Sequence, residues 1–384
     1  MERNFKIVIA TDSFKGSLSS YDAGRAIADG LRKALKNPLI KIVPVADGGE
    51  GTTEALCSAL SGKMTHVNVS DPLGRPVNAA YCIAGDSAIM EMSQADGLPL
   101  LPPDERDPLL ASSFGTGEMI LDALRKGCRK FLIGIGGSAT NDGGTGMLEA
   151  LGYRFIDKDG NILRGCGASL ESISRIDGSG AVPELSQCHF LIACDVDTPF
   201  CGPEGATTVF APQKGADAMT VTRLELGMKT FAETVRKHFG IRLDDIPGSG
   251  AAGGLGGAFR AFLGAELKHG ADMVLETLKF SDIIKGCDLV ITGEGKMDSQ
   301  TLRGKTPAGV LRFASSQGIP VIAFCGRLED KKALADAGFA GCYETDAHGL
   351  PLHEAMRPDI AARNLTETVF RVAQTDRFFN IFAK

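Results

Sequence analysis

The sequence has no excess of positive charge. Its 384 residues include 41 lysines and arginines against 47 aspartates and glutamates, and the basic residues are spread along the chain. The formal net charge is −6. Proteins that bind nucleic acid usually concentrate basic residues on one face. The sequence therefore gives no indication of a nucleic-acid partner.

Long apolar runs and paired cysteines are also missing. No uninterrupted apolar run approaches the roughly 20 residues of a membrane span, so we expect no membrane segment. The ten cysteines form no CxxC pair, and the spacing of Cys194 and Cys201 does not favour a metal site or a disulfide. Cys57, Cys82 and Cys325 have apolar neighbours and are expected in the core. We expect no signal peptide and a cytoplasmic location.

Glycine is abundant instead. The 48 glycines exceed the usual share of about 7% without forming a repeat, and many gather in loops that follow predicted strands. At roughly 150 residues per domain, the length suggests two or three domains. We expect two.

One glycine-rich loop follows a short apolar strand predicted over residues 289–291. Residues 304–306 (GKT) then precede a predicted helix over residues 308–314. The tripeptide is similar to the end of a P-loop, but the pattern fails because Ser299 stands where a glycine is required. Glycine amides, a helix N-terminus and nearby cations still favour an anion site. The cations are Lys296, Arg303 and Lys305. The alternative is a turn with solvated lysines.

A second polar loop follows the strand predicted over residues 5–10. Residues 11–17 include Asp12 and Lys15, and a helix follows in which Ser19 and Asp22 have the spacing of a capping box. Strand, polar loop and helix form the first half of a βαβ unit. Asp12 and Lys15 are therefore expected at a ligand-facing turn, unless they are only a cap and a surface lysine.

Two more loops repeat this arrangement. A strand predicted over residues 41–46 leads to Asp47, to three glycines and to a helix over residues 53–60. Because a carboxylate would repel a phosphate at that helix start, Asp47 is a candidate for Mg²⁺ or a substrate hydroxyl, or else for turn chemistry. A strand over residues 131–135 leads to the loop of residues 136–146, where Asn141 and Asp142 could provide a polar or metal contact.

The remaining segments predict a second domain. Residues 63–92 contain three alternating stretches typical of an antiparallel meander, with Arg75 in a turn that could bind a carboxylate or be only exposed. Residues 208–210 are a further strand candidate, residues 212–215 a basic turn, and residues 247–257 a hinge or a ligand loop. Asp195 and Asp197 follow the strand predicted over residues 190–194.

These elements predict a discontinuous α/β fold. Parallel-type strands near both ends of the sequence indicate a Rossmann- or flavodoxin-like parallel-sheet domain with a mixed α/β domain inserted in it. We expect residues 1–62, 105–148 and 256–384 in the parallel domain. Residues 63–104 and 149–255 are expected in the inserted domain.

Five motifs occur in order along the chain: residues 12–17 (DSFKGS), 47–52 (DGGEGT), 136–144 (GGSATNDGG), 194–197 (CDVD) and 292–300 (TGEG, then DSQ). Together they closely resemble the type 1 glycerate kinase family of bacteria, and the resemblance spans essentially the whole chain. One departure is Lys296, where that family often has arginine. Lysine keeps the charge but loses the bidentate fork.

The resemblance implies ATP-dependent phosphorylation of D-glycerate, commonly at the 2-hydroxyl, giving 2-phosphoglycerate and ADP. It also implies Mg²⁺ and a two-domain α/β architecture with the active site in the cleft between the domains. The oligomeric state is not predicted.

Phosphoryl transfer depends on alignment and charge neutralisation, which suggests a role for each candidate residue. Lys15 is expected to contact phosphate, and Asp47 or Asp195 to orient the attacking hydroxyl or accept its proton. The metal candidates are Asp298 and Glu294. Those for nucleotide are Gly136, Gly137, Ser138, Asn141, Asp142, Gly293, Gly295 and Lys305. Those for glycerate are Asp12, Ser13, Arg75, Lys296 and Arg303.

Three alternatives stay open. The same kinase could act on the 3-hydroxyl, because regiochemistry depends on sub-ångström placement of the substrate. A non-catalytic sugar-acid-binding protein would keep the binding residues without the reaction. A dinucleotide-binding oxidoreductase is disfavoured because no predicted strand ends in GxGxxG with an acidic residue about 20 positions later.

Overall fold

The computed structural model describes residues 5–345 and 349–381. The chain divides into two compact units. Unit 1 comprises residues 1–47, 54–60 and 269–384, and unit 2 comprises residues 48–53 and 61–268. Each unit is described separately below.

Unit 1 is built on a parallel five-stranded sheet with the order β14-β13-β12-β1-β2. The strands are β1 (Lys6–Ile9), β2 (Leu39–Ile42), β12 (Leu289–Met297), β13 (Val321–Leu328) and β14 (Gly341–Glu344). The centre of the sheet is buried on both faces, as continuous apolar sequence predicts for a parallel sheet. In β1, for example, Ile7 and Ile9 are almost fully buried.

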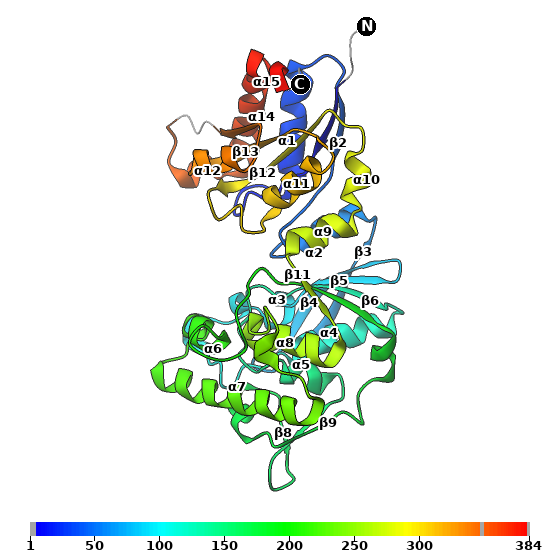
Figure 1. The fold of residues 1–384 in the computed structure, drawn as a ribbon, viewed down its shortest axis with the longest axis vertical. Coiled ribbons are helices and arrows are strands. Elements are labelled where there is room, and N and C mark those ends of the chain that lie inside the picture. The colour runs from blue at the N-terminus through cyan, green and yellow to red at the C-terminus, as the bar shows by residue number, and fades with distance from the viewer. Residues whose placement is uncertain (1–4, 346–348, 382–384) are drawn as a thin grey trace. The chain divides into compact units, whose positions relative to one another are not determined.

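Helices α1 (Ser20–Ala34) and α14 (Pro358–Ala373) lie side by side on one face of this sheet (Figure 1). Ile27 and Leu31 of α1 share one hydrophobic cluster with Leu365 of α14 and with β1. The predicted cap of α1 is confirmed, since Ser19 Oγ accepts a hydrogen bond from the Asp22 amide at 3.1 Å. The first and last parts of the chain therefore build one core.

The other helices of unit 1 are shorter, and α11 packs against β12, β13 and α9. They are α9 (Gly270–Thr277), α10 (Phe280–Ile284), α11 (Thr306–Ser315), α12 (Lys331–Asp336), α13 (Leu352–Ala355), α15 (Asp376–Asn380) and most of α2 (Thr52–Ala59).

Unit 2 contains a mixed six-stranded sheet with the order β11-β10-β6-β5-β4-β3. Its strands are β3 (Lys63–Ser70), β4 (Pro76–Ala84), β5 (Ser87–Glu91), β6 (Lys130–Gly134), β10 (His189–Ala193) and β11 (Glu266–Lys268). The predicted meander is present, because β3, β4 and β5 pair antiparallel. A small antiparallel sheet adds β7 (Arg154–Ile156), β8 (Ile162–Leu163) and β9 (Arg175–Asp177).

Six helices belong to unit 2, and several pack on its sheets around an aromatic core that includes Phe155, Phe231 and Phe259. The helices are α3 (Ser93–Asp96), α4 (Phe114–Arg125), α5 (Thr145–Ala150), α6 (Ala206–Phe210), α7 (Ala218–Phe239) and α8 (Ala251–Leu263). The predicted fold class, a parallel-sheet unit with a second mixed α/β unit inserted in it, is thus observed.

The boundaries between the units differ from those expected. Residues 105–148 and 256–268 belong to unit 2, not to the parallel domain. The reason is β6, which pairs in parallel with both β5 and β10. Its buried apolar run predicts a parallel strand, but the run does not specify which of two sheets the strand joins.

Three local expectations need correction. Residues 208–210 lie in helix α6, because a three-residue alternation is too short to separate strand from helix. Strand β2 ends at Ile42, so residues 43–46 continue outside the sheet. Residues 247–250 form a turn and residues 251–257 the start of α8, and both segments are tightly packed within unit 2 instead of forming a hinge or an open loop. A Cβ on Gly253 would lie 2.1 Å from the Thr140 carbonyl oxygen.

Within the described ranges, no helix combines the length and the apolar character needed to cross a bilayer.

Gly30 provides a test of the contact between α1 and α14. A Cβ at this position would lie 2.6 Å from the Thr366 carbonyl oxygen and 2.8 Å from Val369 Cβ. Replacing glycine by alanine in an exposed helix raises the free energy of unfolding by about 1 kcal/mol. Here we expect Gly30→Ala to lower the free energy of unfolding by about 1–3 kcal/mol, because the added methyl group overpacks the contact. Urea denaturation measures the change.

Arg25→Ala, at an exposed position of the same helix, is the matched control and should change the free energy of unfolding by less than about 0.5 kcal/mol. A stabilised Gly30→Ala variant would contradict the close packing.

Candidate active site

Unit 1 contains a cavity of about 480 Å³ where the carboxyl ends of β1, β12 and β13 meet the loops that follow β1 and β2. Open α/β sheets bind their ligands at this edge. The cavity brings together many of the residues singled out in the sequence. Among them are Asp12, Lys15, Asp47, Glu294, Lys296 and Lys305.

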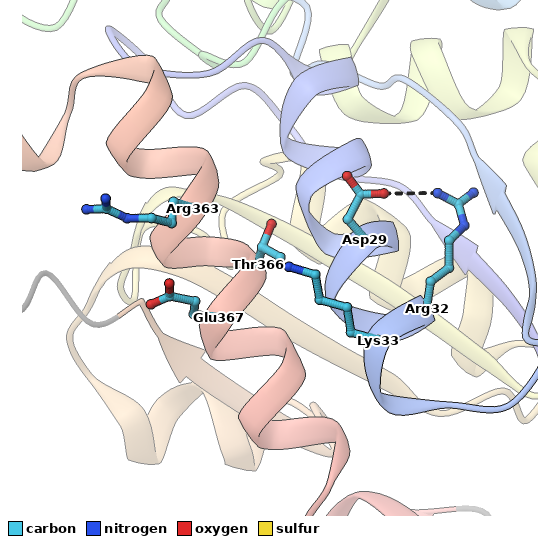
Figure 2. Close-up of a pocket in the computed structure, with 6 residues that line it drawn as sticks. All are labelled: Asp29, Arg32, Lys33, Arg363, Thr366 and Glu367. Atoms are coloured by element: carbon cyan, nitrogen blue, oxygen red, sulfur yellow. Dashed lines mark hydrogen bonds and ion pairs between the residues drawn. The ribbon is translucent and has the colours of Figure 1, made fainter.

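A second hollow of about 450 Å³ lies on the outside of unit 1, between α1 and α14 (Figure 2). Charged side chains line most of it, and Arg32 is paired with Asp29 at 3.1 Å. Figure 2 shows Lys33 extended toward Thr366 and Arg363 directed away from α1. Since this hollow has no buried carboxylate and does not lie at the strand ends, we place the candidate site in the first cavity.

Asp12 is the most buried carboxylate lining the cavity, with 3% of its surface exposed. It follows β1, and its amide donates a hydrogen bond to the Gly293 carbonyl at 2.8 Å. Its Oδ1 accepts from the Ser13 amide at 2.6 Å, and its Oδ2 accepts from Thr306 Oγ1 at 2.6 Å. Thr306 is the first residue of α11. The strand, its loop and this helix together fix the carboxylate.

Burial, followed by the nearby charge of Asp47, raises the pKa of Asp12 from its ordinary value of 3.8 to about 7. The hydrogen bonds from Thr306 and Ser13 stabilise the ionised form and oppose this rise. Asp12 can therefore exchange a proton near neutral pH, as a general base requires.

Lys15 and Asp47 form a looser pair beside Asp12. The Lys15 Nζ lies 3.7 Å from Asp47 Oδ2, and the lysine side chain is 66% exposed while that of Asp47 is 16% exposed. An exposed ion pair of this kind contributes little to stability. The Lys15 ammonium is thus accessible to an anionic ligand.

Glu294 lies on β12 with 8% of its surface exposed. Its Oε1 accepts a hydrogen bond from Thr301 Oγ1 at 2.6 Å, and its Oε2 lies 3.4 Å from Lys305 Nζ. Burial raises the pKa of Glu294, and these two contacts oppose the rise. Glu294 therefore anchors the loop that carries Thr301 and Lys305.

Lys296 connects the ends of β12 and β13. Its Nζ lies 3.3 Å from Asp298 Oδ2 and 2.9 Å from Glu329 Oε2. Burial raises the pKa of Asp298, but the hydrogen bond from the Gln300 amide and the Lys296 charge outweigh that effect, so this pKa lies below its usual value. Asp298 is ionised at neutral pH.

The two predicted metal candidates differ in how well they suit Mg²⁺. This ion takes hard oxygen ligands and often keeps waters and substrate phosphates beside one or two carboxylates. Both carboxylates already have partners, since Asp298 Oδ1 accepts from the Gln300 amide and Asp298 Oδ2 lies 3.3 Å from Lys296 Nζ. Asp298 fits better because its pKa lies below its usual value, whereas burial raises the pKa of Glu294. Across the described ranges, no group of three or more His, Cys, Asp or Glu side chains is arranged to hold a metal ion.

The loop of residues 136–146 lies in unit 2, and only part of it is accessible. Gly136 and Gly137 are exposed, but Ser138 is buried and Asn141 and Asp142 are fully buried. Asp142 Oδ2 accepts from the amide and hydroxyl of Ser113 at 2.8 Å each. Asp142 also accepts from the amides of Gly144 and Gly146. Its carboxylate shapes the loop from inside the unit.

Lys214 was predicted in a basic turn, but it is 2% exposed. Its Nζ donates to Ser138 Oγ at 2.8 Å and to the Thr140 carbonyl at 2.6 Å. Burial lowers the pKa of Lys214 to about 7, against the attraction of Asp142. Lysine is rarely buried, so sequence alone gave no signal that this side chain supports the loop.

Three other candidates lie outside the cavity. Arg75 belongs to unit 2 and is paired with Asp71 at 2.7 Å and with Glu105 at 2.6 Å, so acids of the same unit already occupy it. Asp195 is exposed after β10, also in unit 2. Arg303 is exposed in unit 1 and does not line the cavity.

The predicted glycines differ in role. Gly295 lines the cavity, and a Cβ there would make only ordinary contacts with Phe14 and Lys15. Gly293 is needed for the sheet, because its Cβ would lie 2.0 Å from the Phe324 carbonyl oxygen on β13.

Arg327, near the end of β13, also lines the cavity. It is not among the residues predicted from sequence, although a basic residue at the end of a buried strand could have indicated it.

Comparison with known proteins identifies the class. The profile of the glycerate kinase family matches residues 7–376, and the chain belongs to this family of kinases. A glycerate kinase from Halalkalibacterium halodurans is 42% identical over 94% of this chain and 97% of its own. A glycerate 2-kinase from Escherichia coli is 47% identical over 85% of this chain and 86% of its own.

The fold comparison agrees. A crystal structure assigned as a glycerate kinase 2 from Salmonella typhimurium LT2 has a TM-score of 0.90 and 42% sequence identity, covering 98% of this chain and 100% of that one. The resemblance seen in the five motifs is therefore confirmed.

The electrostatic environment of Asp12 can be tested by titration. Thr306→Val removes a hydrogen bond to the ionised form, so we expect the pKa of Asp12 to rise above about 7. Asp47→Asn removes a neighbouring negative charge, so we expect the same pKa to fall. Carbon-13 NMR of labelled aspartates measures both shifts. Shifts of the same sign in both variants would contradict the assigned causes.

Proposed function

We propose that this protein transfers the γ-phosphoryl group of ATP to the 2-hydroxyl of D-glycerate, giving 2-phosphoglycerate and ADP. The observation that carries the proposal is the buried Asp12 carboxylate, whose pKa is about 7, in a cavity that four basic side chains also line. The E. coli relative at 47% identity is named for the 2-kinase reaction.

Asp12 acts in this proposal as the base that orients the hydroxyl. Its ionised form accepts the hydroxyl proton as the glycerate oxygen bonds to the γ-phosphorus and the bond from that phosphorus to the bridging oxygen breaks. ADP leaves with the electrons of that bond. Asp47 is a predicted alternative base; its Oδ2 lies 3.7 Å from Lys15 Nζ, and its negative charge raises the pKa of Asp12. Asp195 is given no step.

The cations of the cavity neutralise the phosphates and the glycerate carboxylate. They are Lys15, Lys296, Lys305 and Arg327. Phosphoryl transfer gains most from such positioning and charge neutralisation. Lys15 is assigned to the transferred phosphoryl group because its exposed ammonium lies 3.7 Å from Asp47 Oδ2, whose charge acts on Asp12. Lys296 and Arg327 are assigned to the carboxylate of glycerate, and Ser13 to one of its hydroxyls.

Mg²⁺ and nucleotide complete the proposal. Asp298 would hold Mg²⁺, which supplies charge neutralisation on the phosphates. Lys305 and Gly295, which line the cavity of unit 1, stay proposed nucleotide contacts. Gly136 and Gly137 are exposed in unit 2, and their role stays a prediction. Ser138, Asn141 and Asp142 are assigned to the support of their loop.

A non-catalytic sugar-acid-binding protein is the second candidate. Binding alone needs cations for the acid but gains nothing from a carboxyl that titrates near neutral pH in the same cavity. The family membership and Asp12 therefore favour the kinase. Transfer to the 3-hydroxyl would use the same protein groups. Only the position of the phosphate on the product distinguishes it from transfer to the 2-hydroxyl.

The reaction is tested by measuring ADP release from Mg-ATP in parallel with D-glycerate, with L-glycerate and without acceptor. We expect ADP only with D-glycerate, and phosphorus NMR of the product should show the phosphate on the 2-oxygen. A product signal from 3-phosphoglycerate would show that the 3-hydroxyl is the acceptor. If folded protein releases no ADP above the blank, the kinase proposal is wrong and the non-catalytic binding protein is favoured.

The role of Lys15 is tested by Lys15→Ala. We expect turnover to fall by about 10²–10³-fold because one charge on the transition state is lost. Lys33→Ala, an exposed lysine outside this cavity, serves as the control and should leave turnover unchanged. Near-normal turnover of Lys15→Ala would remove this residue from the mechanism.

A further inference from the structure

The cavity of unit 1 is larger and more apolar than glycerate requires. Its volume of about 480 Å³ lies in the range of roughly 300–1,000 Å³ typical of drug-sized ligands. Glycerate is a three-carbon acid with a polar group on every carbon. Most of this space is therefore left for another part of the reacting complex.

Apolar side chains from α13, from the residue after it, from α14 and from the loop after β1 line part of the cavity. We call this part the apolar wall, and define it as Phe14, Leu352, Ala355, Met356 and Ala361. Leu352 is 74% exposed, one of the most exposed large hydrophobic residues in the described chain. An exposed apolar surface next to convergent charged groups is characteristic of a ligand site.

The wall adjoins the loop that carries Lys15. A Cβ placed on Gly16 would lie 3.1 Å from Met356 Cε, so Met356 packs against the residue next to Lys15. A ligand whose flat apolar part lay on the wall would therefore have its charged part near Lys15. This polarity, an apolar ring at one end and phosphates at the other, is that of a nucleotide.

Asn364 adds a polar group to the same cavity. It lines the cavity, is 3% exposed, and its Oδ1 has no hydrogen-bond partner in the described part of the chain. A buried amide oxygen without a hydrogen-bond partner lowers the stability of the folded protein by about 1–3 kcal/mol. Such an oxygen therefore usually accepts a hydrogen bond from a ligand or a water molecule. An asparagine amide pairs well with adenine, donating to one ring nitrogen and accepting from the exocyclic amino group.

We propose that the apolar wall and Asn364 form the site of the adenine ring of the nucleotide. The inference rests on the proposed kinase function and names the base site of its phosphoryl donor. The apolar wall packs against the adenine ring, and the Asn364 amide forms hydrogen bonds with the polar edge of the ring. The phosphates then extend toward Lys15 and Lys305, which line the same cavity.

The experiment measures binding by calorimetry with two probes, ADP and inorganic tripolyphosphate, each with Mg²⁺. Tripolyphosphate carries the phosphates without the base. For Leu352→Ser we expect ADP affinity to fall about tenfold, because truncating a well-packed apolar contact has this order of effect. Tripolyphosphate affinity should stay unchanged. Leu226→Ser, at an exposed leucine of α7 outside the cavity, is the matched control.

Asn364→Leu separates base recognition from packing. The change removes an unpartnered buried polar atom, so thermal stability should be kept, while the preference for ADP over GDP should fall about tenfold as the hydrogen bonds to adenine are lost. If Asn364→Leu fails to fold, the binding data for Leu352→Ser alone test the adenine site. Leu352→Ser should fold because the Leu352 side chain lies mainly in solvent.

Two results would overturn the adenine site. One is equal affinity of the wild type for ADP and tripolyphosphate. The other is unchanged ADP binding by Leu352→Ser with an unchanged ADP preference in Asn364→Leu. Neither depends on turnover. A protein that binds ADP through the wall but releases no ADP from ATP and D-glycerate would refute the kinase and keep the nucleotide site.

Discussion

Unit 1 depends on one buried interaction, the hydrogen bond between Thr306 and the Asp12 carboxylate. It joins the loop after β1 to the first residue of α11, so it links segments that are far apart in sequence but meet at one edge of the sheet. The same bond limits how far burial raises the pKa of Asp12. One contact thus sets both the position of the carboxylate and its readiness to take a proton.

Much of this arrangement could be read from the sequence. Buried strands followed by glycine and charge predicted the loops after β1, β2 and β12, and the cap of α1 followed from the spacing of Ser19 and Asp22. The number of units was also correct. What the apolar pattern could not supply was the partner of each strand, because a run such as residues 131–135 is equally compatible with either sheet. The assignment of residues 105–148 failed for that reason.

The candidate residues divide by burial, which sequence does not report. Asp12 and Asp142 both stand in polar loops after parallel strands, yet Asp12 lines a cavity whereas Asp142 gives its oxygens to four donors within unit 2. Lys214 was likewise predicted in a basic turn, but its side chain is buried and donates hydrogen bonds to the loop of residues 136–146. The composition of the sequence identified loops that combine glycine with charged and hydroxyl side chains. Only the direction of each side chain separates a group that meets a ligand from one that holds the loop.

The pairing of β1 with β12, and of α1 with α14, has a consequence for synthesis on the ribosome. Residues 6–42 emerge first, but β12 begins at Leu289 and α14 at Pro358. Unit 2 is encoded almost without interruption between them and can close its own sheet earlier. Strand β1 and helix α1 must wait, with apolar faces uncovered, until unit 2, β12 and α14 have been made. During synthesis, these two elements are therefore the part of unit 1 that stays exposed to aggregation for longest.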